Sequence, residues 1–143
     1  MSLFSAFSIG ASGMAAQRAR AELLVENLAN ADTTRTPEGG PYRRKDAVFQ
    51  SADVESPFSS VFDIAQSSNG VAVADIVTDG RDPERRYLPG HPDADSEGYV
   101  AFPRVNPAED MVDLMGATRS YEANVAAIAA VKDMIVRSID LLR

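Results

Sequence analysis

The sequence of 143 residues contains no cysteine. It therefore forms no disulfide, offers no thiolate nucleophile and has no sulfur ligand for a zinc site. It also has no uninterrupted apolar run of the roughly 20 residues that a transmembrane helix requires. The apolar N-terminal residues 2–16 are diluted by serine and glycine and are preceded by no basic residue, so we do not expect a cleaved signal peptide there.

Clustered positive charge is also missing. The net charge is −7, from 14 basic and 21 acidic residues, and acidic residues outnumber basic ones in 1–32, in 33–105 and in 106–143. The basic runs at 43–45 and 85–86 are short and lie among acidic residues. Binding to a phosphate backbone needs a basic patch, so we expect no nucleic-acid partner.

Proline is confined to the middle of the chain, because all eight prolines lie between positions 37 and 107. Apolar residues recur in residues 3–30 with alternating spacings of four and three, which predicts one long amphipathic helix. Six of the seven positions in this stripe are apolar, and Arg18 is the exception. The stripe consists of Phe7, Ala11, Met14, Arg18, Ala21, Val25 and Leu28.

Two glycines weaken the start of this helix. Gly10 and Gly13 each cost about 1 kcal/mol relative to alanine in a helix interior. The first turns could simply fray, or they could order only on assembly. Small residues also permit a close approach by another helix.

A second long helix is predicted over residues 107–143. Asn106 is a capping residue, Pro107 suits the first helical position and Glu109 follows three residues after Asn106. The predicted stripe of this helix consists of Met111, Leu114, Thr118, Tyr121, Val125, Ile128, Lys132, Ile135, Ile139 and Leu142. If the two helices pair within one chain they must be antiparallel, and placing Leu28 opposite Leu114 brings Arg18 near Tyr121 or Glu122. We expect Glu122 to neutralise Arg18.

The residues between the helices are rich in turns. Residues 71–78 alternate apolar side chains and predict a strand, while 42–50 and 99–102 are weaker strand candidates. The predicted fold is therefore α+β, with long N- and C-terminal helices pairing as an antiparallel coiled-coil-like domain. Residues 1–32 with 107–143 form that helical domain, and 33–106 form a β/loop-rich middle segment.

One loop in this middle segment suggests a calcium site. Asp93, Asp95, Glu97 and Gly98 match the first half of a calcium-binding loop, but position 12 of that loop would be Arg104. Prolines before and after the loop also prevent flanking helices. His91 is the only histidine, too few for a zinc site, so we expect a structural role for it and no bound metal.

No set of residues indicates catalysis. A nucleophile with a base and an orienting group is not recognisable, and neither is a phosphate-binding loop. We therefore expect neither an enzyme nor a cofactor. From the residues alone, an assembly subunit is favoured, and the alternative is a soluble coiled-coil adaptor whose middle segment binds a peptide or calcium.

Several segments resemble flagellar rod and hook proteins, the axial protein family of the bacterial flagellum. The N-terminal signature is similar to residues 15–34, AAQRARAELLVENLANADTT, and the C-terminal signature to NPAEDMVDLM (106–115) followed by RSYEANV (119–125). GGPYRRK (39–45) and PGHPDADSEGYV (89–100) are similar to the short proximal-rod members. The resemblance covers nearly the whole chain, and residues 51–69 match least.

The resemblance implies a subunit exported unfolded through the flagellar type III apparatus, without signal cleavage, into the periplasm-spanning rod of the basal body. Its implied partners are other proximal and distal rod proteins, the export-gate/MS-ring adaptor and the surrounding ring proteins. The acidic loop, with His91, Asp93 and Asp95, would be a contact between subunits. The expected assembly interface consists of Phe7, Ala11, Met14, Val25, Leu28, Asn30, Met111, Leu114, Tyr121, Val125, Ile128, Ile135, Ile139 and Leu142.

Overall fold

The computed structural model of the chain describes residues 3–53 and 69–140. Its elements are α1 (Leu3–Ala29), β1 (Lys45–Asp53), β2 (Asn69–Thr78), β3 (Glu84–Tyr87), β4 (Tyr99–Phe102) and α2 (Pro107–Asp140). The predicted α+β composition, with a helix at each end and strands between, is confirmed. Leu142, the last residue of the predicted stripe, lies outside the described residues.

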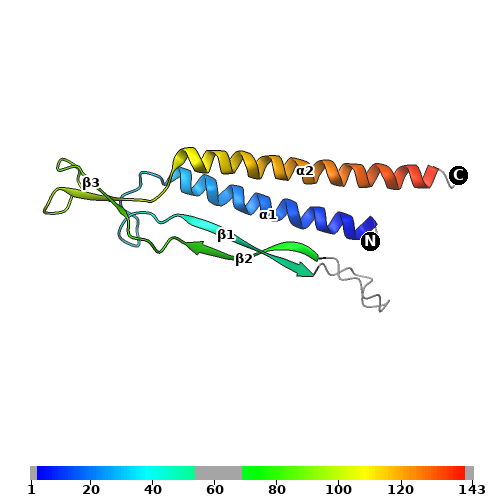
Figure 1. Cartoon of the computed structure of the whole chain (residues 1–143), viewed down its shortest axis with the longest axis horizontal. Helices are drawn as coiled ribbons and strands as arrows, with labels where there is room; N and C mark the ends of the chain where they lie inside the picture. The colour runs from blue at the N-terminus through cyan, green and yellow to red at the C-terminus, as the bar shows by residue number, and fades with distance from the viewer. Residues whose placement is uncertain (1–2, 54–68, 141–143) are drawn as a thin grey trace.

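The molecule is elongated, and α1 lies between α2 and the ribbon of β1 and β2 (Figure 1). The second pair of strands, β3 and β4, lies at the end of the molecule where α1 ends and α2 begins. At the opposite end, α2 continues beyond the first residues of α1. No helix in 3–53 or 69–140 combines the length and the apolar character needed to cross a membrane.

Both helices have the ends that their sequences predict. The Asn106 side chain accepts a hydrogen bond from the Ala108 N–H at 3.2 Å, and Pro107 occupies the first helical position. At the end of α1, the Asn30 side chain donates to the Glu26 carbonyl at 2.9 Å and accepts from the Thr33 hydroxyl at 3.1 Å. The Asn106 contact satisfies an N–H of the first turn that has no partner within the helix, and the Asn30 contacts connect the last turn of α1 to the loop that follows.

The two glycines of α1 lie directly against side chains of α2. A Cβ atom at Gly10 would lie 2.9 Å from Ile128 Cγ1, and one at Gly13 would lie 3.0 Å from Asn124 Nδ2. Arg20, further along α1, lies 3.7 Å from Asp113, which is earlier in α2. The helices thus run in opposite directions, and the glycines allow their close approach.

The predicted stripe of α2 coincides with the partly buried face at some positions and misses it by one residue at others. Asp110 and Ala117, each 2% exposed, are the buried residues, whereas Met111 and Val125 are 52% and 45% exposed. Leu114, Ile128 and Ile135 of the predicted stripe are half-buried, so the covered side of α2 combines these residues with Asp110 and Ala117.

The strands pair antiparallel in two separate ribbons. β1 pairs with β2 from Lys45↔Thr78 to Asp53↔Asn69, with a register shift after Val48 that makes Ala74 the extra residue of a bulge. The strand predicted at 71–78 is confirmed, and that predicted at 42–50 begins only at Lys45. The Tyr42 N–H instead donates to the Thr33 carbonyl in the preceding loop.

The other ribbon pairs β3 with β4 from Glu84↔Phe102 to Tyr87↔Tyr99. β4 coincides with the predicted strand at 99–102, whereas β3 was not predicted. The turn before β4 needs Gly98, because its φ is +83° and a Cβ atom there would lie 2.9 Å from the Tyr87 ring.

Among residues 3–53 and 69–140 the buried apolar core has only six members. Its members lie on both helices, on β4 and in the loop before β1, and they are Ala16, Leu24, Tyr42, Val100, Phe102 and Ala117. Much of the apolar surface of the helices and of the β1–β2 ribbon therefore stays exposed in the single chain.

Candidate assembly interface

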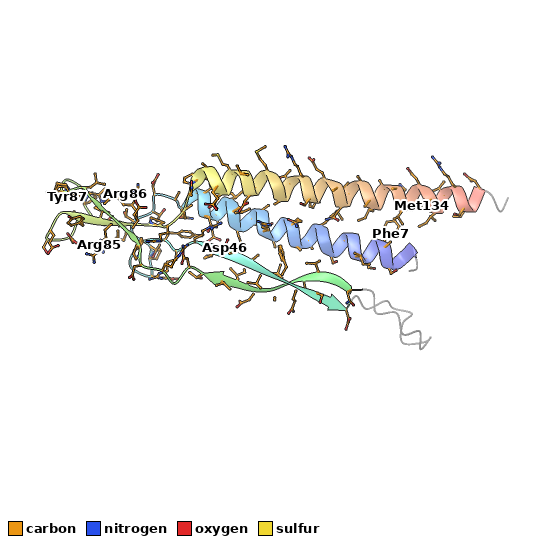
Figure 2. The ribbon with its side chains drawn as sticks, in the orientation of Figure 1. Phe7, Asp46, Arg85, Arg86, Tyr87 and Met134 are labelled. Carbon is orange, nitrogen blue, oxygen red and sulfur yellow. The ribbon has the colours of Figure 1, made fainter. Side chains whose placement is uncertain are left out.

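The most extensive apolar surface lies along α2. Among the elements of the described residues, only α1 packs against this helix. The large apolar residues of α2 that are at least 40% exposed are Met111, Val112, Met115, Tyr121, Val125, Met134, Val136 and Ile139. Figure 2 labels Met134 near the far end of the helix. So many exposed large apolar residues on one helix are typical of a surface that another protein covers.

The residues expected at the interface divide into two groups. Met111, Tyr121, Val125 and Ile139 of α2, with Ala11 and Val25 of α1, are exposed and available to a partner. The second group is partly covered within the chain, and it consists of Phe7, Met14, Leu28, Asn30, Leu114, Ile128 and Ile135. This exposure is compatible with contacts between chains for the first group, and the second group mainly connects α1, α2 and the loops.

Arg18 does not pair with Glu122. Its Nε donates to Glu22 Oε1 at 2.8 Å, one turn further along α1, and both side chains are largely exposed. This local hydrogen bond raises the pKa of Arg18, with a small contribution from nearby Tyr121. The prediction of an interhelical pair was wrong because a partner four residues away on the same helix is closer.

A buried polar cluster fixes α1 to the start of β1. Asn27 is fully buried, and its side chain meets both backbone groups of Lys45: Nδ2 donates to the carbonyl and Oδ1 accepts from the N–H, each at 2.9 Å. The Tyr42 hydroxyl also donates to Oδ1 at 2.9 Å. Burial raises the pKa of Tyr42 to about 12, so this hydroxyl keeps its proton under ordinary conditions.

A second buried group fixes α2 to the same segment. Asp110 Oδ1 lies 2.9 Å from the Arg44 guanidinium, and Asp110 is 2% exposed. Burial raises the pKa of the Asp110 carboxyl, and the Arg44 charge offsets this only in part. The Arg44 guanidinium also lies 3.4 Å from Asp46, at the start of β1 (Figure 2). The two clusters hold both helices against one short segment, residues 42–46, in a fixed relative position.

The oxygens of the acidic loop are used within the chain. Asp93 accepts a hydrogen bond from the Thr34 hydroxyl at 2.8 Å and lies 3.7 Å from Arg35. Asp95 Oδ1 accepts from the N–H groups of Glu97 and Tyr99 at 2.9 and 2.8 Å, as in an ordinary turn. The two carboxylates thus connect the loop to the segment after α1 and close the turn before β4.

His91 has a structural contact in the same loop. Its Nδ1 accepts a hydrogen bond from the Asp93 N–H at 3.1 Å, and its ring lies 6.3 Å from that of Phe102. In the described part of the chain, no three histidine, cysteine or acidic side chains are grouped as a metal site would require. His91, Asp93 and Asp95 together stabilise the shape of one exposed loop.

The β3–β4 hairpin carries an exposed aromatic pair that was not predicted from the sequence. Tyr87 is 63% exposed and its ring packs edge-on against that of Tyr99, with 5.4 Å between the ring centres. Figure 2 labels Tyr87 and its neighbours Arg85 and Arg86 at this end of the molecule. Period-two alternation of Arg85 with Tyr87 was the available signal, but it spans too few residues to be recognised.

Comparison with known proteins identifies the family. The flagellar basal-body rod protein FlgC of Bacillus subtilis is 42% identical to this chain, and the alignment covers 99% of each protein. The chain belongs to the FlgC family. The FlgC of Borreliella burgdorferi is 38% identical over the whole of this chain, and that of Salmonella typhimurium is 38% identical over 99% of it. Residues 96–141 also match the family model for the C-terminal part of the flagellar basal body rod FlgEFG proteins.

Membership of the FlgC family bears on the alternatives. The names of these relatives describe a rod protein of the flagellar basal body. They do not favour a soluble coiled-coil adaptor or a calcium-binding module. The FlgC match spans the two helices and the middle segment together, so the resemblance carried by the terminal signatures and by the acidic loop is confirmed as one family assignment.

Proposed function

We propose that this chain is a structural subunit of the proximal rod of the bacterial flagellar basal body and serves motility as part of a hollow, torque-transmitting axle. The single observation that carries the proposal is full-length similarity to FlgC proteins, at 42% identity for the Bacillus subtilis relative. The exposed apolar surface of α2 supports it, because a subunit built to polymerise needs such a surface on a chain with a small core.

In this proposal the terminal helices, residues 1–32 with 107–143, form an antiparallel coiled-coil-like domain that lines the inner tube. The close approach at Gly10 and Gly13 supports this pairing. Residues exposed on the outer side of the pair, including Met111, Val125 and Ile139, pack against the same helices of neighbouring subunits. Neighbour contacts of this kind compensate for the small core of the single chain.

The middle segment, residues 33–106, lies outside this tube and contacts neighbouring subunits through the loop of His91, Asp93 and Asp95. The intrachain hydrogen bonds of the two carboxylates support a shaped protein-binding loop more than a cation site. The partners are other proximal and distal rod proteins, the export-gate/MS-ring adaptor and the surrounding rings. The subunit reaches the rod through the flagellar export apparatus without a cleaved signal.

The experiment is to delete the gene from the bacterium that produces this chain and to image its basal bodies by electron microscopy. We expect loss of the rod, and restoration by the full chain but not by a chain without residues 2–16. Rods that form without the gene would refute the function, and rods restored by the shortened chain would refute the role of the first turns of α1.

A further inference from the structure

Two arginines from distant parts of the chain hold the turn between β2 and β3. The Arg43 Nη1 donates to the Asp79 carbonyl at 3.0 Å, and the Arg104 Nε donates to the Asp82 carbonyl at 2.8 Å. Arg43 precedes β1 and Arg104 follows β4, so the fold brings their segments together at this turn. Because a backbone carbonyl holds each guanidinium, both groups are positioned before a partner binds.

Neither of these guanidinium groups has an acidic partner among the described residues. The neighbouring arginines do: Arg44 forms ion pairs at 3.4 and 2.9 Å, and Arg81 forms one at 2.6 Å. The Asp79 carboxylate accepts hydrogen bonds from Arg81 on both of its oxygens, at 2.9 and 2.6 Å. The site therefore keeps two unpaired positive charges, Arg43 and Arg104, on a chain whose net charge is −7.

The two arginines line a hollow with rigid walls. Three prolines from three different segments, Pro41, Pro83 and Pro103, form these walls together with Tyr42. Pro103 and Tyr42 are buried, whereas both arginine side chains are exposed at the rim. Proline fixes its own φ, so the walls lose little conformational freedom when another molecule binds.

The chemistry of the hollow fits a carboxylate. A guanidinium has five N–H donors, and each of these two arginines makes a single hydrogen bond within the described residues. The planar fork of a guanidinium matches the two oxygens of a carboxylate. A phosphate group has a similar match, but binding to a phosphate polymer needs a more extensive basic surface than two arginines on an acidic chain.

We propose that this hollow, which we call the arginine hollow, binds an acidic segment of a different protein in the rod. An aspartate or glutamate of that segment lies between the guanidinium groups of Arg43 and Arg104, and the rest of the segment packs against the prolines. This inference rests on the proposed function and adds a partner of defined chemistry to the middle segment.

The carboxylates of this chain favour a different protein as the occupant. Three acidic residues of the middle segment pair with arginines of the same chain: Asp46 with Arg44, Asp79 with Arg81 and Glu84 with Arg86. The carboxylates of the acidic loop also accept hydrogen bonds within the chain. The middle segment of a second copy therefore has few free carboxylates to place in the arginine hollow.

Zero-length cross-linking in isolated basal bodies tests the site. The chain has only two lysines, Lys45 and Lys132, so an introduced amine is readily identified. Arg104→Lys keeps the positive charge, and a carbodiimide joins its amine only to a carboxylate that touches it. We expect an amide to an aspartate or glutamate of another rod protein, located by mass spectrometry. The matched control is Arg86→Lys, an arginine of the same segment that pairs with Glu84 and should give no link to another protein.

The second arginine provides a quantitative test. Arg43→Gln added to Arg104→Lys removes one of the two charges and should lower the cross-link yield, per copy of the chain in the rod, about fivefold. This ratio corresponds to an exposed ion pair of ~1 kcal/mol. Arg43→Lys in its place should keep most of the yield, because it keeps the charge.

Four results would overturn the arginine hollow as a binding site for another protein. They are a link confined to carboxylates of the same chain, a link to a second copy or to a non-protein acid, an equal yield from Arg86→Lys, and a yield that Arg43→Gln leaves unchanged. Rods that contain the Arg104→Lys chain but give no cross-link would also overturn it. These rods would leave the proposed function intact, whereas rods that form without the gene would refute that function.

Discussion

Removal of the Asn27 side chain should destabilise the chain more than any other single amide-to-alanine change in α1. Asn27→Ala removes a hydrogen-bond partner from three polar groups: the N–H and carbonyl of Lys45 and the Tyr42 hydroxyl, each now 2.9 Å from the amide. A buried polar group that loses its partner costs about 1–3 kcal/mol. Because Lys45 is only half-buried, we take the lower end for each group and expect a loss of about 3 kcal/mol.

Asn30→Ala is the matched control. This residue lies three positions later in the chain, and its side chain bonds only to Glu26 and Thr33 nearby, so its removal should cost about 1 kcal/mol. The assay is urea unfolding of the purified chain followed by circular dichroism, with the m-value checked for constancy. A loss below about 1 kcal/mol for Asn27→Ala, or one no larger than the control's, would refute the role of this amide in joining α1 to β1.

Three further predictions concern packing and pH. Gly116→Ala should raise the free energy of unfolding by about 1 kcal/mol, since a Cβ atom there meets nothing within 4 Å. At Gly10 the same substitution should bring no gain, because the added Cβ atom would clash with α2. Urea unfolding of both variants tests this, and equal gains would contradict the close approach of the helices. Hydrogen bonds from Arg81 lower the pKa of Asp79 from 3.8 to about 2. The stabilisation of the fold by this carboxylate should therefore be complete above pH 3.8 and lost as the pH falls through 2. A difference in the free energy of unfolding between the wild type and Asp79→Asn that stays constant across that window would contradict this. Burial raises the pKa of Asp110 above 3.8. The wild type should therefore lose stability relative to Asp110→Asn as the pH rises from below 3.8 through the higher folded-state pKa. Unfolding measured across that range tests this, and the absence of such a loss would mean that the carboxyl is not desolvated.

The long helices were predictable because local signals agree over many residues. The spacing of apolar residues, the absence of proline and the capping by Asn106 and Asn30 each act within a few positions, and α1 and α2 follow them closely. β4 and the core of β2 were predictable from short apolar alternation. These features depend on neighbours along the chain, which a sequence displays directly.

The missed features depend on groups far apart in the chain. The sequence of β3, Glu84-Arg-Arg-Tyr87, has no apolar alternation. It forms a strand because β4 pairs with it and because the Arg86 guanidinium packs over the Phe102 ring. At the start of α2 the buried position is Asp110 and not the predicted Met111, because Arg44 from the middle segment pairs with the Asp110 carboxylate. The spacing of apolar residues along one helix does not show that Arg44, far away in the sequence, pairs with it.

The sequence predicts which type of residue lies at the interface, but it does not predict which protein contacts those residues. Exposed apolar side chains such as Val125 follow from a helix that is apolar on more than one row, which indicates a further contact surface but not the protein that covers it. The exposed aromatic pair of the β3–β4 hairpin was not predictable, because it arises from strand register. The family itself was recognisable from the terminal signatures and the loop at 89–100.

The central claim is that neighbouring subunits cover the exposed side of α2 in the rod. The most direct measurement is maleimide labelling of Val125→Cys, a position 45% exposed in the single chain, in purified chain and in isolated basal bodies. Leu24→Cys, at a position only 4% exposed, serves as the control that stays protected in both. We predict rapid labelling of Val125→Cys in the purified chain and protection in basal bodies, and equal labelling in the two would contradict the account.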